Sequence, residues 1–230
     1  VDDLYGIEIV KRTSNDGEHI SLAVMEKRTT AEYYKSKLDS SVQRLQSLED
    51  DVLENLGTLK GLKKAVEYVR LCNECNVSTV MYNYLSGESL PFIDMSKGYS
   101  LHDRALGAIV LEVDVMGDDS GTVKSSIGRI LTDAGLSISN GSQIPTAKVS
   151  VKITWSEQKG TGVASSFTFA LYNADVSFID LVGDEAVMVE SFKGREGHQS
   201  FEGARTRAVS SLVKELDAKL SLILKDAYSY

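Results

Sequence analysis

Two cysteines, Cys72 and Cys75, carry the most distinctive chemistry in this sequence. A reactive Cys-x-x-Cys pair usually lies at the amino terminus of a helix, where the helix dipole lowers the thiol pKa. Here the pair falls inside an expected helix, with Cys72 on the apolar face. A zinc site would need two more ligands at close spacing, and His19, His102 and His198 are far apart in the chain. Burial as small apolar residues is the favoured interpretation, and redox or metal chemistry is the alternative.

An acidic, glycine-containing stretch, MGDDSG at residues 116–121, joins an expected strand to an expected helix. Nucleotide-binding loops often lie at such junctions, but a phosphate loop needs several glycines and a lysine. The two carboxylates found here would favour the helix dipole and repel a phosphate. We therefore expect a capped helix entry, and a divalent-cation site formed by Asp114, Asp118 and Asp119 is the alternative.

A third group, Arg195, Glu196 and His198, lies in the sequence GREGH just before the last expected helix. Such side chains can act in acid–base catalysis, but no second cluster faces them in the sequence and no G-x-S-x-G nucleophile motif is present. The glycines suit a strand-to-helix turn. We interpret the motif as structural or as part of an interface, with Arg195 and His198 as candidate contact residues. The KGTG stretch at residues 159–162 predicts only a loop between strands.

The 230 residues carry a formal net charge of −8, and 42% are hydrophobic and 25% charged. These values are those of a folded globular protein rather than a disordered one. The negative charge disfavours nucleic acid or an anionic membrane surface as a partner, and no apolar run approaches the roughly 18–20 residues that span a bilayer. Because the chain begins at Val1 without a signal-peptide pattern, we expect a processed fragment that lacks its targeting signal.

The elements that must position these residues begin with a predicted β-hairpin. Apolar runs at residues 7–10 and 20–25 flank a polar stretch that contains Asp16 and Gly17, and Asp-Gly is a strong hairpin turn signal.

Two predicted helices follow, because apolar residues recur at three- and four-residue steps in two successive stretches. The first stretch, after a cap at Thr29 or Thr30, comprises Leu38, Val42, Leu45, Leu48, Val52 and Leu56. The second comprises Leu59, Leu62, Val66, Val69, Cys72, Val77, Val80 and Leu85. Each helix would have roughly 25 residues and a length of ~40 Å. Gly57 between them favours an antiparallel αα-hairpin, and one continuous bent helix is the alternative.

The rest of the chain predicts a small domain with the order β-α-β-β-β-α. Strands are expected at residues 108–116, 149–155, 167–178 and 187–192, and helices after Ser120 and from about Ser200. The apolar positions change parity along the third strand, so we expect a bulge near Asn173. An extra short strand at residues 136–139 would be compatible with the pattern. This order predicts an α+β fold with helices on one face of the sheet.

These elements predict two separable domains, a β-hairpin with a helical hairpin at residues 1–86 and an α+β domain at residues 106–230. Residues 87–105 are expected to form the linker, because the stretch from Gly87 to Gly98 has no apolar period and contains Pro91.

Two stretches resemble a known family. The sequence HISLAVMEKRTTAEYYKSKL at residues 19–38 resembles the strand-to-helix segment of the twenty-kilodalton LPP lipoprotein family, with its tyrosine pair at Tyr33 and Tyr34 and later basic residues at Lys35 and Lys37. The sequence SFKGREGHQSFEGARTRAVSSLVKEL at residues 191–216 resembles the end of the same lipoproteins. It is also similar to the amino-terminal domain of TolB, to CsgG and to LpoB. Gly203 stands where the family tends to have an acidic residue.

The resemblance implies an exported bacterial protein at the periplasmic face of the outer membrane, held there by a lipid anchor that this fragment lacks. We expect a non-catalytic interaction or structural protein with no cofactor, whose partner is an envelope protein or a second copy. The alternatives are a small redox or metal-dependent enzyme that uses Cys72, Cys75 and His198, or a small-ligand carrier. Apolar residues partly off the main helical stripes are candidate contacts, although scattered surface apolar residues are also normal. These are Leu48, Leu53, Leu59 and Tyr68.

Overall fold

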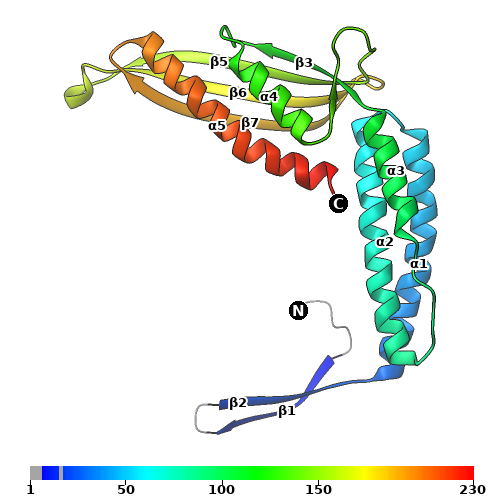
Figure 1. Cartoon of the computed structure of the whole chain (residues 1–230). Helices are drawn as coiled ribbons and strands as arrows, with labels where there is room; N and C mark the ends of the chain where they lie inside the picture. The colour runs from blue at the N-terminus through cyan, green and yellow to red at the C-terminus, as the bar shows by residue number, and fades with distance from the viewer. Residues whose placement is uncertain (1–6, 16–17) are drawn as a thin grey trace. The chain divides into compact units, whose positions relative to one another are not determined.

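The computed structural model describes residues 7–15 and 18–230 and has an α+β fold (Figure 1). The predicted turn at Asp16 and Gly17 lies outside the described residues. The chain divides into two compact units. Unit 1 consists of residues 1–50 and 67–99, and unit 2 consists of residues 51–66 and 100–230. Unit 2 therefore includes the tip of the helical hairpin as well as the C-terminal sheet.

The N-terminal β-hairpin of unit 1 consists of β1 (Ile7–Asn15) and β2 (Glu18–Met25), which pair antiparallel. The register shifts between Ile9 and Lys11, which makes a bulge at Val10. Past the bulge, Lys11 pairs with Leu22.

Two separate helices, α1 (Lys27–Glu54) and α2 (Leu59–Ser86), confirm the predicted αα-hairpin rather than one bent helix. Gly57 between them has a φ of +85°, a left-handed conformation that strains other residues. Most of the predicted apolar positions are buried, including Leu38, Leu45, Leu62 and Val66. Three predicted inward positions are instead about half exposed, namely Val42, Val77 and Val80.

The linker prediction for residues 87–105 is wrong in its second half, because α3 spans Met95–Gly107. The loop before α3 runs back along α2 and is held by two asparagines. Asn83 accepts a hydrogen bond from the backbone N–H of Leu90 (2.8 Å) and donates one to its carbonyl (3.0 Å). Asn76 makes the same two bonds with Ile93, at 2.7 and 3.1 Å. The loop is thus attached at two points one heptad apart.

The sheet of unit 2 has the strand order β4-β3-β5-β6-β7, and helices α4 (Thr122–Asp133) and α5 (Phe201–Tyr228) cover one face (Figure 1). Its strands are β3 (Val110–Met116), β4 (Ser137–Ile138), β5 (Ala147–Lys159), β6 (Thr168–Asp180) and β7 (Glu185–His198). A short 3-10 turn, Gly162–Ala164, lies between β5 and β6. Strand β3 pairs with β5 in parallel. Strand β6 pairs antiparallel with both β5 and β7. The predicted element order, including the extra short strand, is confirmed.

The bulge predicted near Asn173 is wrong. Alternate residues of β6 are buried without interruption from Ala170 to Asp180, and the only irregularity in its pairing with β7 lies at Phe178 and Ile179. The misleading signal came from the small inward residues Ala170 and Ala174, which look less like core positions than their larger outward neighbours.

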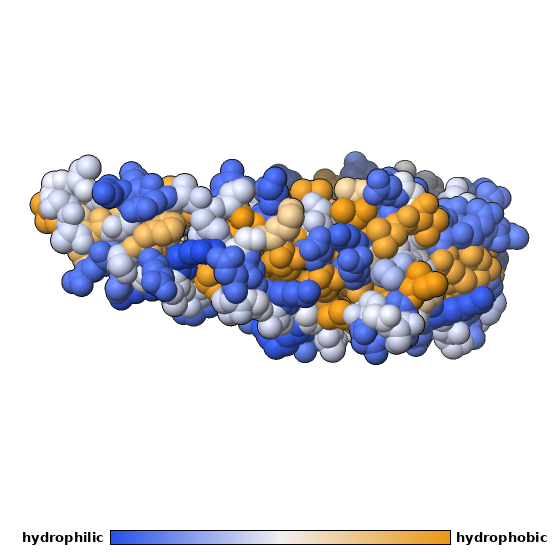
Figure 2. Space-filling view, turned by 90° about the horizontal axis from the view of Figure 1, so that it is seen from above, coloured by the Kyte–Doolittle hydropathy of each residue, from blue (hydrophilic) through white to orange (hydrophobic). Residues whose placement is uncertain are grey.

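Figure 2 views the molecule from above, and hydrophobic and hydrophilic side chains are interspersed on that face.

The helix ends of unit 2 follow capping rules in part. Ser200 caps α5 by accepting a hydrogen bond from the backbone N–H of Gly203 (3.2 Å). At the start of α4, the predicted Ser120 accepts a bond from the N–H of Thr122 (3.3 Å), and Asp118 accepts one from the N–H of Lys124 (2.9 Å).

A buried carboxylate joins the tip of the helical hairpin to the sheet of unit 2. Asp180, at the end of β6, accepts hydrogen bonds from the backbone N–H groups of Leu59 (2.6 Å) and Lys60 (3.1 Å). It thereby caps the amino terminus of α2 from 121 residues away in the chain. Buried His102 of α3 makes a second connection, with Nε2 2.9 Å from the carbonyl oxygen of Tyr228.

The two-domain boundary stays a prediction that limited proteolysis can test. Chymotrypsin is expected to cut first at Phe92, which is 61% exposed and lies in the non-helical stretch between α2 and α3. Mass spectrometry of early time points identifies the cut. First cuts inside β3 or β5 would show instead that the sheet opens before the loop does.

Candidate functional site

The GREGH motif packs its glycines against aromatic rings. A Cβ atom at Gly194 would lie 2.4 Å from the hydroxyl of Tyr172, and one at Gly197 would lie 2.8 Å from the ring of Phe169. A Cβ at Gly203, the position at which this sequence departs from the lipoprotein pattern, would lie 2.1 Å from Nδ1 of His198. A side chain at any of these positions would therefore force the neighbouring ring to shift.

The charged residues of the motif also have structural partners. The guanidinium of Arg195 lies 4.5 Å from the centroid of the Phe169 ring. Glu196 accepts a hydrogen bond from the hydroxyl of Ser211 on α5 (2.6 Å). Nδ1 of His198 lies within hydrogen-bonding distance (3.3 Å) of the hydroxyl oxygen of Ser200, the residue that caps α5. The contact of Arg195 joins β7 to β6, whereas those of Glu196 and His198 join β7 to α5 and its cap. Arg195 is exposed and His198 is half-buried.

A cleft of about 440 Å³, lined mostly by polar residues, lies between the β3–α4 loop and the first turns of α5. Arg205 forms an ion pair with Asp119 (2.6 Å) and lies 5.1 Å above the ring of Trp155. Trp155 donates a hydrogen bond from Nε1 to the carbonyl oxygen of Gly117 (2.8 Å). The loop is thus held by one side chain of β5 and one of α5.

The divalent-cation alternative is not supported by the placement of its three carboxylates. Asp114 forms an ion pair with Lys148 of β5 (2.9 Å), Asp118 caps α4, and Asp119 pairs with Arg205. Within residues 7–15 and 18–230, no group of three or more metal-ligating side chains is arranged to hold an ion.

Tyr172 lies behind the GREGH motif with its hydroxyl directed to Glu215 of α5 (3.2 Å). Burial, followed by the negative charge of Glu215, raises the pKa of Tyr172 to about 12. The phenol therefore stays protonated at neutral pH and acts as a hydrogen-bond donor between the sheet and α5.

Both cysteines are buried free thiols in unit 1, whereas His198 belongs to unit 2. Burial, together with the neighbouring thiol of Cys75, raises the pKa of Cys72 to about 11. Burial also raises the pKa of Cys75. A thiol that stays protonated at neutral pH is a weak nucleophile and a weak metal ligand.

Replacing Cys72 with serine is expected to lower the free energy of unfolding by about 1–2 kcal/mol, because a hydroxyl then takes the place of a fully buried small apolar group. Urea denaturation of the wild type and the variant measures the difference, and Ser36→Ala, on an exposed position of α1, is the control. Stoichiometric zinc in the purified wild type, lost in the variant, would contradict the structural interpretation.

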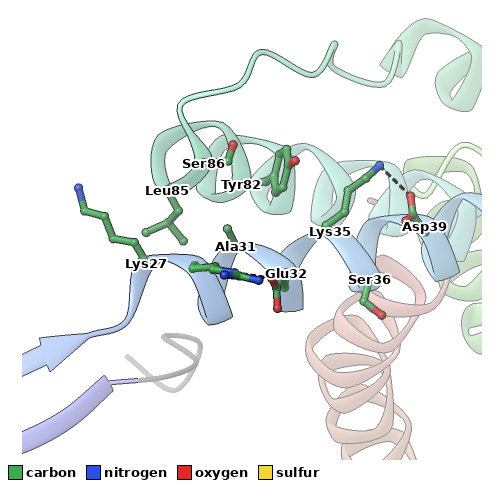
Figure 3. A pocket seen from close by; sticks show the side chains of 10 residues that line it. Lys27, Ala31, Glu32, Lys35, Ser36, Asp39, Tyr82, Leu85 and Ser86 are labelled. Atoms are coloured by element: carbon green, nitrogen blue, oxygen red, sulfur yellow. Dashed lines mark hydrogen bonds and ion pairs between the residues drawn. The ribbon is translucent and has the colours of Figure 1, made fainter.

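A groove of about 630 Å³ lies in unit 1 where the start of α1 meets the end of α2 (Figure 3). Its apolar floor is formed by Ala31 and Leu85, and its rim is mostly charged. Arg28 forms an ion pair with Glu32, and Lys35 forms one with Asp39. The members of each pair are one helical turn apart. The rim charges thus neutralise one another locally around a small apolar floor.

The predicted interface residues have different surroundings. Leu48, Leu59 and Tyr68 are buried, with at most 5% of their surface exposed. These three side chains are therefore covered within the chain rather than exposed to a partner. Leu53 is 40% exposed. Whether Leu53, Arg195 or His198 contacts a partner stays a prediction.

The largest set of exposed aliphatic side chains lies on the β-hairpin instead, and sequence reasoning did not single it out. Each member is at least 42% exposed. They are Ile7, Ile9, Val10, Ile20, Leu22 and Val24. The available signal was the apolar alternation of the two strands, which form a two-stranded sheet of their own among the described residues. None of the described helices has the length and hydropathy that a membrane-spanning helix needs.

No family model matches the chain, and no curated protein matches it by sequence. Solved structures do. A secreted protein of Helicobacter pylori matches over 99% of this chain and 78% of its own, with a TM-score of 0.50 and 11% identity. A minor lipoprotein of Acinetobacter baumannii matches over 52% of this chain and 90% of its own, with a TM-score of 0.37 and 13% identity. The rare lipoprotein B of Shewanella oneidensis matches over 51% and 91%, with a TM-score of 0.32 and 13% identity.

At these identities the likeness concerns the fold alone. The chain shares its fold with a secreted bacterial protein over nearly its whole length, and bacterial lipoproteins are among the weaker matches. Membership of the LPP family, and similarity to TolB, CsgG or LpoB, is not confirmed.

Proposed function

We propose that this chain is an exported bacterial envelope protein that acts by binding another protein chain through its N-terminal β-hairpin. The observation that carries the proposal is the set of six exposed aliphatic residues on β1 and β2. Ile20, Leu22 and Val24 share one face of the hairpin, and Ile7 and Ile9 pair with residues of the other face. Exposed apolar patches typically mark sites of interaction. Unit 2, whose polar motifs join one element to another, would serve as the folded support.

The envelope location is proposed from the motif resemblance at residues 19–38 and 191–216. The fold shared with the secreted H. pylori protein is compatible with it. A lipid anchor and the periplasmic face of the outer membrane are the finer parts of this proposal.

Site-specific photo-cross-linking in the native bacterium tests both parts. A photoreactive amino acid replaces Ile20 on the hairpin, which is 63% exposed, or Leu222 on α5, which is 69% exposed and serves as the matched control. A discrete protein adduct is expected only from position 20, and only in the envelope fraction. Equal adducts from both positions, or none, would overturn the hairpin as the binding surface. Adducts in the cytosolic fraction would overturn the location.

A further inference from the structure

We propose that β2 pairs edge to edge with β2 of a second copy of this chain, so that two hairpins form one four-stranded antiparallel sheet. The inference rests on the proposed function, and it specifies the partner as this same chain.

One face of the hairpin carries an aliphatic stripe. Ile20, Leu22 and Val24 alternate along β2 and are 63%, 54% and 44% exposed. Since alternate residues of a strand share a face, the three side chains lie side by side. Their neighbours across β1 are all polar. These neighbours are Thr13, Lys11 and Glu8. The stripe is therefore confined to β2, next to the edge that pairs with no other described strand.

The two edges of the hairpin differ in a way that selects β2. Folded proteins protect exposed strand edges with bulges and with charged side chains, especially lysine. The β1 edge has both, because the bulge at Val10 is followed by Lys11 and Arg12. The described pairing contains no bulge in β2, and the seven residues from His19 to Met25 include no acidic, lysine, arginine or proline residue. The β2 edge is open to a further strand.

The arrangement of residues along β2 favours a second copy as that strand. The uncharged stretch is centred on Leu22, and antiparallel pairing about that residue places Leu22 opposite Leu22 of the other copy. Ile20 then lies opposite Val24, twice by symmetry. Every stripe residue thus meets an aliphatic residue, which is the favourable kind of cross-strand pair. A two-fold contact of this type needs only one self-complementary surface.

The pairing also removes a weakness of the isolated hairpin. Two strands alone are marginally stable in water, whereas three or more strands with an apolar face can be stable. Because the contacting stretch is uncharged while the chain has a net charge of −8, salt should not weaken the contact. It should instead screen the repulsion between copies and slightly favour the dimer.

Sedimentation velocity of the whole chain at rising concentration tests the proposal. The wild type should form a dimer, and Leu22→Glu should raise the dimer dissociation constant at least about tenfold. The matched control is Val80→Glu on α2, because Val80 is 52% exposed and Leu22 is 54% exposed. This control should dimerise like the wild type, and circular dichroism should show unchanged helix content in both variants.

Hydrogen exchange of the wild type gives a second readout that needs no variant. The alternate amides of residues 19–25 that point away from β1 should gain protection as concentration rises, and should gain more than the amides of residues 7–14. A wild type that stays monomeric, a Leu22→Glu variant that still dimerises, or a dimer dissociated by Val80→Glu would each overturn the proposal. A monomeric wild type whose position 20 cross-links to a different protein would overturn self-pairing and leave the proposed function standing.

Discussion

Asp180→Ala is expected to lower the free energy of unfolding by about 3–5 kcal/mol, because it leaves two backbone N–H groups at the start of α2 without their acceptor. Leu59 and Lys60 donate these bonds, and the carboxylate that receives them is 95% buried. Hydrogen bonds to a charged group are stronger than those between neutral groups, and a buried unsatisfied donor bears the full desolvation cost. Urea denaturation monitored by circular dichroism measures the loss.

Two further variants make this measurement specific. Asp180→Asn keeps one acceptor oxygen and should lose less than the alanine variant. Asp50→Ala removes a carboxylate from an exposed position of α1 and should be nearly neutral. If Asp180→Ala and Asp50→Ala proved equally stable, the tip of the helical hairpin would not depend on this cap.

Gly117→Ala is expected to be comparably severe, with a loss of about 3 kcal/mol or more. Gly117 has a φ of +83°, which costs a residue with a Cβ roughly 1–2 kcal/mol. The added Cβ would also lie 2.3 Å from the carbonyl oxygen of Ile153, so the backbone of β5 or of the loop must move. That movement would disturb the hydrogen bond from Trp155 to the Gly117 carbonyl. Because the chain has one tryptophan, its fluorescence reports the change directly.

Gly121→Ala provides the matched control in the same loop. Gly121 also has a positive φ, +69°, but no atom lies within 4 Å of its added Cβ. This variant should therefore show the conformational cost alone, and the tryptophan spectrum should not change. If both variants lost the same free energy of unfolding, the loop would be able to move without cost. The close approach to Ile153 would then not contribute to the effect of Gly117→Ala.

The elements with long, regular apolar patterns were predictable from sequence, and the contacts between distant elements were not. In α5, Ala204, Leu212 and Leu216 lie on the buried face as their spacing indicated. Helix α3 as a whole was missed, because Gly98 and Ser100 interrupt any apolar period. A glycine suits position 98 because α3 packs closely there: an added Cβ would lie only 3.3 Å from the side chain of Val69.

The candidate sites illustrate the same division. The spacing of Cys72 and Cys75 on a helix was sufficient to predict their burial. By contrast, the reason for each glycine in the GREGH motif is a ring that belongs to a different strand. Likewise, the exposed hairpin could not be recognised from its own sequence, because an alternating strand looks the same whether or not another layer covers it.

The cap that Asp180 places on α2 has a consequence for the order of events during synthesis. Chains are made from the amino terminus, and early elements can begin to fold before later ones exist. Helix α2 leaves the ribosome long before Asp180 does. More than half of the polypeptide must therefore be synthesised between the first turn of α2 and its hydrogen-bond acceptor. Until then the nascent chain has an incomplete helical hairpin. Chaperones that bind the nascent chain during this interval would contact residues 51–66 before the sheet has formed.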